Sequence, residues 1–298
     1  MAHIGLKEIV VLSGKGGTGK TSITAAFALL ADTEAVVADC DVDAADMHLL
    51  LGPDFAQRES FYSGQVAKID PERCIQCGQC ADVCHFGAVQ IADGVHSIQA
   101  LRCEGCRYCA RVCSAHAIQM EDRKAGEWFY STIKNGGIMI HAALGIASDN
   151  SGKLVAHVKN EARKAAGELD RPIVLVDGSP GIGCPVVSSL SGADYVVYVT
   201  EPTVSGLHDL QRVAQTAAGF GMPSGCIINK ADLYPAMAEK IRVFIQEAGI
   251  EYLGDLPYSE AFPKAMLEAK SVVEQTNSDV KELLVKMWQK VRSSVFKN

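Results

Sequence analysis

A glycine-rich segment near the N-terminus has the residue types and spacing of a phosphate-binding loop. It follows the apolar run 9–12 and reads Ser13-Gly14-Lys15-Gly16-Gly17-Thr18-Gly19-Lys20-Thr21-Ser22. Glycines let backbone N–H groups point at phosphate oxygens, Lys20 reaches the terminal phosphates, and the Thr21 hydroxyl is a ligand for Mg²⁺. The segment therefore predicts a P-loop, followed by a helix whose positive N-terminal end favours anions.

Eight of the 11 cysteines form two runs with one spacing. The first run is Cys74-x-x-Cys77-x-x-Cys80-x-x-x-Cys84, and the second is Cys103-x-x-Cys106-x-x-Cys109-x-x-x-Cys113. Three thiolates at two-residue gaps are enough for three irons of an iron–sulfur cube, while the fourth is carried away on the next turn. Zinc is the alternative, because paired cysteines also make tetrahedral sites, but zinc would leave surplus thiols in each run.

Carboxylates follow two of the predicted strands. Asp39, Asp41 and Asp43 come directly after the apolar run 35–38, and Asp177 closes the run 173–176. Ligands of a parallel sheet gather at the carboxyl ends of its strands, so these carboxylates should face the P-loop. We predict that Asp177 holds Mg²⁺ through water, and Asp43 is left without a role.

A further polar segment follows the apolar run 226–228. It reads Asn229-Lys230-Ala231-Asp232, which has the form of a nucleotide-base recognition segment. An aspartate there accepts hydrogen bonds from guanine, whereas an asparagine amide also pairs with adenine, so both bases stay open. Pro257, after the last predicted strand, is placed to border the base.

The elements that position these residues alternate between strand and helix. Continuous apolar strands separated by amphipathic helices predict an α/β fold with a doubly wound, mostly parallel sheet. We assign residues 1–60 and 124–298 to this domain and residues 61–123 to an inserted α+β domain that contains both cysteine runs. Segment 128–141 indicates a hairpin. Buried-type strands are expected at 172–176, 195–200, 225–228 and 252–256, and helices at 153–169, 206–220 and 235–248. Short β-like pieces, such as 65–69, are expected before the cysteine runs.

Composition limits the classes of partner. The chain has 298 residues, 48% of them hydrophobic, and a formal net charge of -7. That acidity argues against a general nucleic-acid binder, whose affinity comes from clustered Lys and Arg. No apolar stretch is long enough for a membrane span, so we expect a cytoplasmic protein. The C-terminal helix has one apolar face, which we expect to pack on the sheet; membrane binding is the less favoured alternative.

Lys15 is a second lysine near the start of the P-loop, and with it the segment resembles the deviant Walker A motif of the MinD, ParA and Mrp ATPases. The resemblance implies a homodimer in which Lys15 crosses to the phosphates of the facing subunit. It also implies ATP as the nucleotide. By the same matching, Asp41 orients the attacking water, Asp39 lies near Mg²⁺, and the segments around Asp39 and after Asp177 are switch loops.

The cysteine runs resemble those of the two-cluster bacterial ferredoxins, in which the fourth cysteine of each run ligates the other cluster. The resemblance implies one [4Fe–4S] cluster on Cys74, Cys77, Cys80 and Cys113, and a second on Cys84, Cys103, Cys106 and Cys109. The chain departs from that family where a proline normally follows the fourth cysteine. His85 and Ser114 stand there instead.

Three functional hypotheses follow. The leading one is a homodimeric, Mg²⁺-dependent ATPase whose nucleotide state gates electron transfer from two [4Fe–4S] clusters to an unidentified redox partner protein. The second is an ATP-dependent carrier that delivers iron–sulfur or metal centres to an apo-protein. The third is a MinD-like positioning ATPase on a membrane, although neither membrane association nor nucleic-acid binding is expected.

Overall fold

The computed structural model describes residues 5–145, 151–275 and 279–297. The chain forms two compact units, one made of residues 1–59, 128–144 and 151–298, and the other of residues 60–127 with 145–150. The division falls within two long strands, β3 (Gln57–Ile69) and β6 (Ile118–Thr132). All eight cysteines of the two runs lie in the second unit.

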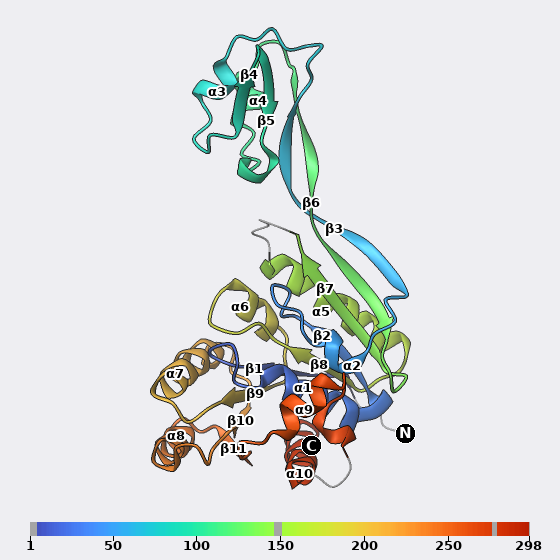
Figure 1. Ribbon diagram of the computed structural model, residues 1–298, viewed down its shortest axis with the longest axis vertical. Coiled ribbons are helices and arrows are strands. Elements are labelled where there is room, and N and C mark those ends of the chain that lie inside the picture. The colour runs from blue at the N-terminus through green and yellow to red at the C-terminus, as the bar shows by residue number, and fades with distance from the viewer. Residues whose placement is uncertain (1–4, 146–150, 276–278, 298) are drawn as a thin grey trace. The chain divides into compact units, whose positions relative to one another are not determined.

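The first unit is built on a mostly parallel sheet. The sheet has nine strands in the order β11-β10-β9-β1-β8-β2-β7-β6-β3. Every pair from β11 to β7 is parallel, which confirms the predicted α/β class. Figure 1 shows these strands: β1 (Lys7–Leu12), β2 (Ala35–Asp39), β7 (Ile138–Leu144), β8 (Ile173–Asp177), β9 (Tyr195–Thr200), β10 (Ser224–Ile228) and β11 (Glu251–Asp255).

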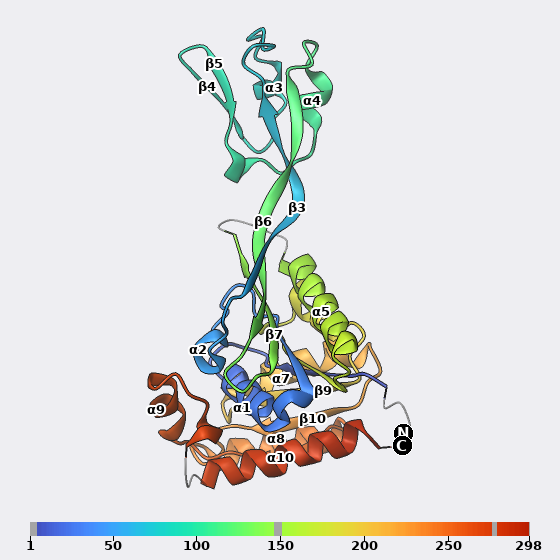
Figure 2. The same cartoon turned by 90° about the vertical axis from the view of Figure 1, so that its right-hand side faces the viewer.

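Helices cover both faces of this sheet, which is why its central strands are buried along their whole length. Figure 2 shows α1 and α5 on opposite faces. α1 packs with α10 and with Ile9 and Val11 of β1, whereas α5 packs on β2, β7 and β8. The helices are α1 (Lys20–Ala31), α2 (His48–Leu51), α5 (Ser151–Glu168), α6 (Cys184–Leu190), α7 (Val204–Ala218), α8 (Pro235–Glu247), α9 (Ala261–Leu267) and α10 (Asp279–Val295), with short 3₁₀ turns at Asp32–Glu34 and Val272–Glu274.

The apolar face of α10 lies in the main core, as predicted. Its buried residues pack with α1, and Trp288 lies against Phe27 with ring centroids 5.1 Å apart. This face is therefore not free to bind a membrane. Among the described residues, no helix has the length and apolar character needed to cross one.

The second unit has a small core of its own. It contains α3 (Gln79–Asp82), α4 (Tyr108–Val112), a 3₁₀ turn at Ala100–Arg102, and the antiparallel pair β4 (Val89–Ala92) and β5 (Val95–Ile98). Its buried cluster consists of Ala67, Cys80, Ala88, Cys103 and Ile118. The sequence predicted only a short strand near residues 65–69; β3 instead begins at Gln57, because it and β6 continue as hydrogen-bonded neighbours from the large sheet.

Candidate functional site

The P-loop joins the buried strand β1 to α1. Gly17 and Gly19 have φ angles of 80° and 92°, a left-handed backbone that favours glycine. A Cβ on Gly19 would also lie 2.4 Å from Nδ2 of Asn229. That amide nitrogen donates to the carbonyl oxygen of Thr18 over 2.8 Å. The base-recognition segment predicted from the sequence therefore holds the P-loop in shape.

Lys20 lies among carboxylates at the carboxyl edge of the sheet. Its side chain is only 5% exposed, and its Nζ lies 2.8 Å from Oδ2 of Asp177 and 3.5 Å from Oδ2 of Asp41. The Thr21 hydroxyl donates to the same Asp177 oxygen over 2.8 Å. Asp39 is opposite Asp177 in the register of β2 and β8. The structure thus brings together every residue predicted to bind Mg²⁺ or to act in hydrolysis, except Lys15.

Negative charge exceeds positive charge in this cluster. Burial, and then the neighbouring Asp177, raise the pKa of Asp39 well above its usual range. Burial also raises the pKa of Asp41. Burial opposes the charge on Lys20, but Asp177 and Asp41 outweigh it and raise the lysine pKa. One oxygen of Asp39 is buried without a hydrogen-bond partner among the described residues. An unpaired carboxylate oxygen suits Mg²⁺, which takes one or two carboxylates and completes its coordination with water and phosphate oxygens.

Thr24 belongs to this cluster, although the sequence did not single it out. Its hydroxyl donates to Oδ1 of Asp177 over 2.8 Å, so Asp177 accepts from both Thr21 and Thr24. Thr24 lies one helical turn after Lys20, and its single hydroxyl proton is also within reach of the Lys20 carbonyl oxygen, 2.9 Å from Oγ1, as an alternative acceptor. The signal in the sequence was the i, i+4 spacing on the first turn of the helix.

Lys15 lies outside the carboxylate cluster. Its Nζ is 2.6 Å from Oε1 of Glu201, which follows β9, and 3.0 Å from Oγ of Ser205 at the start of α7. A weaker contact of 3.4 Å joins it to the hydroxyl of Thr203, the N-cap residue of α7. Glu201 was missed in the sequence, although it stands at the carboxyl end of a parallel strand, as Asp39 and Asp177 do.

Glu201 also binds Lys230. The Lys230 Nζ lies 3.1 Å from Oε2 of Glu201 and donates to the carbonyl oxygen of Gly17 over 3.3 Å. Burial opposes ionisation of Glu201, but Lys15 and Lys230 outweigh it and lower the pKa of this carboxyl. One carboxylate therefore connects both lysines and, through Lys230, the middle of the P-loop.

Most of the other residues predicted to bind the nucleotide, and Asp43, lie in exposed or loop positions. Asp232 is exposed and accepts a hydrogen bond from the backbone N–H of Tyr258 over 2.6 Å, directly after Pro257. A Cβ on Gly14 would lie 2.4 Å from Cβ of Asp209, so the loop entry packs against α7. Asp43 is exposed and stays without a role. The parts of Gly16 and Ser22 in binding, and of Asp232 and Pro257 in base recognition, stay predictions.

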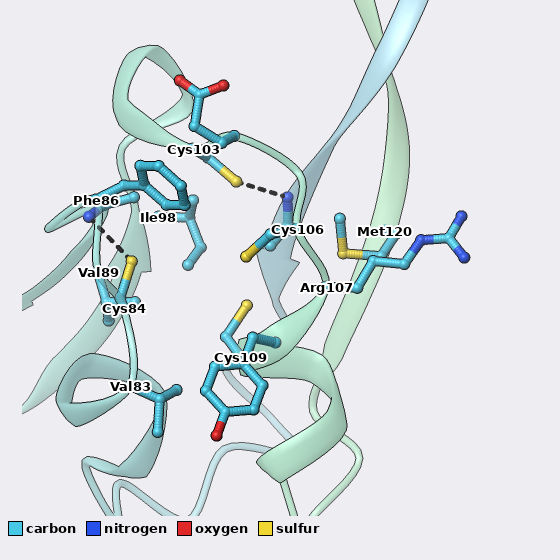
Figure 3. Close-up of a pocket in the computed structure, with 14 residues that line it drawn as sticks. Val83, Cys84, Phe86, Val89, Ile98, Cys103, Cys106, Arg107, Cys109 and Met120 are labelled. Atoms are coloured by element: carbon cyan, nitrogen blue, oxygen red, sulfur yellow. Dashed lines mark hydrogen bonds between the residues drawn. The ribbon is translucent and has the colours of Figure 1, made fainter.

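The cysteines of the second unit line two hollows. The first hollow, of about 340 Å³ including its open part, is lined by Cys74, Cys77, Cys80 and Cys113. The second, of about 360 Å³, is lined by Cys84, Cys103, Cys106 and Cys109. Figure 3 shows the four side chains of the second hollow around one space. Each hollow thus combines three cysteines of one run with the fourth cysteine of the other.

Backbone N–H groups point at several of these sulfurs. The N–H groups of Ala88 and Ala117 lie 3.3 Å from the Sγ atoms of Cys84 and Cys113, four residues before each. The N–H of Ala67 lies 3.4 Å from Sγ of Cys103. Within the described parts of the chain, no three Cys, His, Asp or Glu side chains come together closely enough to hold a single metal ion.

Comparisons with known sequences identify the family of the chain. A family model described as the CobQ/CobB/MinD/ParA nucleotide binding domain matches residues 9–272. An uncharacterized protein of Methanocaldococcus jannaschii is 32% identical over 302 residues, covering 99% of this chain and 100% of that protein. A second uncharacterized protein of the same organism is 26% identical, covering 89% of this chain and 91% of its own.

Comparisons with solved structures give the same fold. The septum site-determining protein MinD of Pyrococcus horikoshii, complexed with Mg-ADP, matches with a TM-score of 0.58 and 17% identity over 98% of each chain. The cell division ATPase MinD of Pyrococcus furiosus matches with a TM-score of 0.56 and 17% identity, covering 97% of this chain and 99% of its own. These structural similarities show the fold, and the family model shows the family. The chain belongs to the CobQ/CobB/MinD/ParA family of nucleotide-binding proteins.

Proposed function

We propose that the protein is a Mg²⁺-dependent ATPase that acts as a homodimer. The observation that carries this proposal is the cluster of Lys20, Thr21, Asp39, Asp41 and Asp177 at the P-loop. Phosphoryl transfer needs positioning and neutralisation of charge rather than a covalent nucleophile, and this cluster supplies both. The MinD structure of Pyrococcus horikoshii contains Mg-ADP, which supports an adenine nucleotide here.

Each residue of the cluster has a role in this proposal. The P-loop N–H groups bind phosphate oxygens, and Lys20 leaves Asp177 to neutralise the terminal phosphates. Thr21, Asp39 and Asp177 hold Mg²⁺, which supplies electrostatic stabilisation of the developing charge. Asp41 orients the attacking water.

Lys15 acts on the facing subunit in the proposed dimer. In the isolated chain its ammonium group is bound by Glu201 and Ser205, away from the Asp41 and Asp177 carboxylates that surround Lys20. This position supports a role other than binding the nucleotide of its own subunit. Hydrolysis that depends on protein concentration, and that disappears in Lys15→Ala, would support the dimer. A rate per subunit that is independent of concentration would refute it.

We further propose that the two cysteine-lined hollows bind two [4Fe–4S] clusters. The donor set fits, because thiolates are the ligands of such clusters and each hollow has four. Cys74, Cys77, Cys80 and Cys113 would hold one cluster, and Cys84, Cys103, Cys106 and Cys109 the other. When bound, the clusters supply one-electron redox chemistry.

In the first candidate function, nucleotide state gates electron transfer to a partner protein. Because each proposed cluster uses four cysteines and leaves no spare thiol in its hollow, electron transfer is favoured over a carrier function that delivers clusters to an apo-protein. Anaerobic purification with iron and sulfide analysis tests cluster content, and EPR-monitored titration with and without ATP tests gating. Asp41→Asn, which should bind ATP without hydrolysing it, gives the matched sample for the ATP-bound state.

The second candidate is a MinD-like positioning ATPase, and the comparisons support it better than they support electron transfer. Several similar structures carry names from cell division and plasmid partition. Those names belong to proteins under 20% identical to this chain. Co-sedimentation with liposomes and with DNA, in the presence of ATP, separates the two candidates. ATP-dependent binding to either one would favour positioning, and its absence together with full iron and sulfide content would favour electron transfer.

A further inference from the structure

One histidine of the second unit has no hydrogen-bond partner for either ring nitrogen among the residues that the structure describes. His96 lies on β5 and is only 8% exposed. Both Nδ1 and Nε2 are buried and make no hydrogen bond to any part of the chain described here. The side chain lines the first hollow together with Cys74, Cys77, Cys80 and Cys113.

An imidazole always carries at least one N–H donor. A buried donor without an acceptor lowers stability, and buried polar side chains are therefore nearly always paired. Because the His96 side chain lines the first hollow, a hydrogen-bond acceptor for its ring would lie inside that hollow. The unpaired ring thus indicates that the first hollow holds a group able to accept a hydrogen bond.

The second hollow is lined by different side chains. Side chains two residues apart in a strand share a face, and His96 and Ile98 of β5 both point inward. Ile98 lines the second hollow and has no donor. Ala67, which precedes Cys74 by seven residues as His96 precedes Cys103, also lines it without a side-chain donor. Tyr108 lines it as well but is 47% exposed, whereas His96 is buried. Arg107 also lines it, but Nε and one terminal nitrogen of its guanidinium donate to Oε1 of Gln65. Figure 3 shows this guanidinium turned away from the cysteines.

We propose that His96 donates a ring N–H to the iron–sulfur cluster of the first hollow and thereby sets its reduction potential apart from that of the second. This inference rests on the proposed cluster occupancy of both hollows. Reduction adds negative charge to a cluster, and hydrogen bonds to its sulfurs stabilise that charge and raise the potential. His96 is accordingly a tuning residue for one cluster and not a ligand.

The test is an EPR-monitored redox titration of the full chain, purified anaerobically, after iron and sulfide analysis. Without His96 the ratio of oxidised to reduced first cluster at a fixed potential should rise about tenfold, which corresponds to a potential lower by about 59 mV for one electron. His96→Leu removes the donors, and His96→Gln retains an N–H. Ser97→Ala, on the exposed face of the same strand, is the matched control.

The expected result is a lowered potential for one cluster in His96→Leu, partial return in His96→Gln, and no change in Ser97→Ala. The cluster affected should be the one whose signal Cys77→Ser alters. If His96→Leu loses the first cluster while His96→Gln keeps it, the donor role is also supported. Unchanged potentials in His96→Leu at full iron and sulfide content would overturn this inference but leave the proposed cluster binding intact. Equal loss of the cluster in both His96 variants would also overturn it, and wild-type protein without iron and sulfide would overturn the proposed function with it.

Discussion

Replacing Glu201 by Gln tests whether the contact seen at Lys15 restrains dimer formation. In the isolated chain Glu201 binds Lys15 at 2.6 Å and Lys230 at 3.1 Å. In the proposed dimer Lys15 must leave this carboxylate to reach the phosphates of the facing subunit. The substitution keeps the size and hydrogen-bonding capacity of the side chain but removes its charge. Lys15 should then be released at a lower cost, so that ATP-dependent dimers form more readily.

The size of the effect follows from the exposure of the pair. A hydrogen bond to a charged group contributes about 1.5–3 kcal/mol, and an exposed ion pair about 0.2–1 kcal/mol. The side chains of Lys15 and Glu201 are 30% and 16% exposed, so we take the contribution of this ion pair to lie between the two ranges, at about 1 kcal/mol. That energy is about fivefold in an equilibrium constant. A homodimer releases two such lysines, which gives a dimer dissociation constant lower by roughly 25-fold.

Sedimentation equilibrium with a non-hydrolysable ATP analogue measures that constant. Glu239→Gln is the matched control, because it makes the same charge change at an exposed ion pair with Arg242 on α8. A dissociation constant within twofold of wild type would refute the proposed restraint. A weaker dimer would mean that Glu201 positions Lys15 for the partner subunit instead of holding it back.

Three further predictions concern the nucleotide-binding unit. Asp41→Asn should lower ATP hydrolysis by about 10²-fold or more while ATP binding persists, whereas Lys20→Ala should lose binding; phosphate release and equilibrium binding measure the two effects. Burial, and then the charge of His48, lower the pKa of His141 to about 4 in the folded protein. As the pH falls, the His141 imidazole is therefore protonated in the unfolded chain at a higher pH than in the folded protein. Stability should therefore be full above about pH 6.5 and fall by about 2 kcal/mol by pH 5, and urea unfolding of His141→Asn should lack this loss. Trp288→Ala should lower the free energy of unfolding by about 3–5 kcal/mol, because the ring is buried against Phe27; a loss below 1 kcal/mol would mean that α10 is not part of the core.

The sequence predicted an element correctly wherever the residues that define it lie within one short stretch of the chain. The P-loop, the strand ends at Asp39 and Asp177, and the amphipathic α10 were predicted because short-range spacing determines both the element and its buried face. The alternation of strands and helices likewise predicted a parallel sheet, which the pairing from β11 to β7 confirms. The extent of β3 was wrong, because a strand that reads as polar is held by its neighbour β6 and not by an apolar pattern of its own.

The sequence by itself determined which residues are available for phosphate, Mg²⁺ and thiolate chemistry, and the order in which the elements carry them. Only the tertiary structure decided which of these side chains meet. Glu201 reaches Lys15 across 186 positions of chain because β9 lies beside β1 in the sheet. His96 stands beside the cysteines of the first hollow because β5 turns that face inward. Contacts of this kind depend on how strands pair and which face they bury, and no local spacing encodes them.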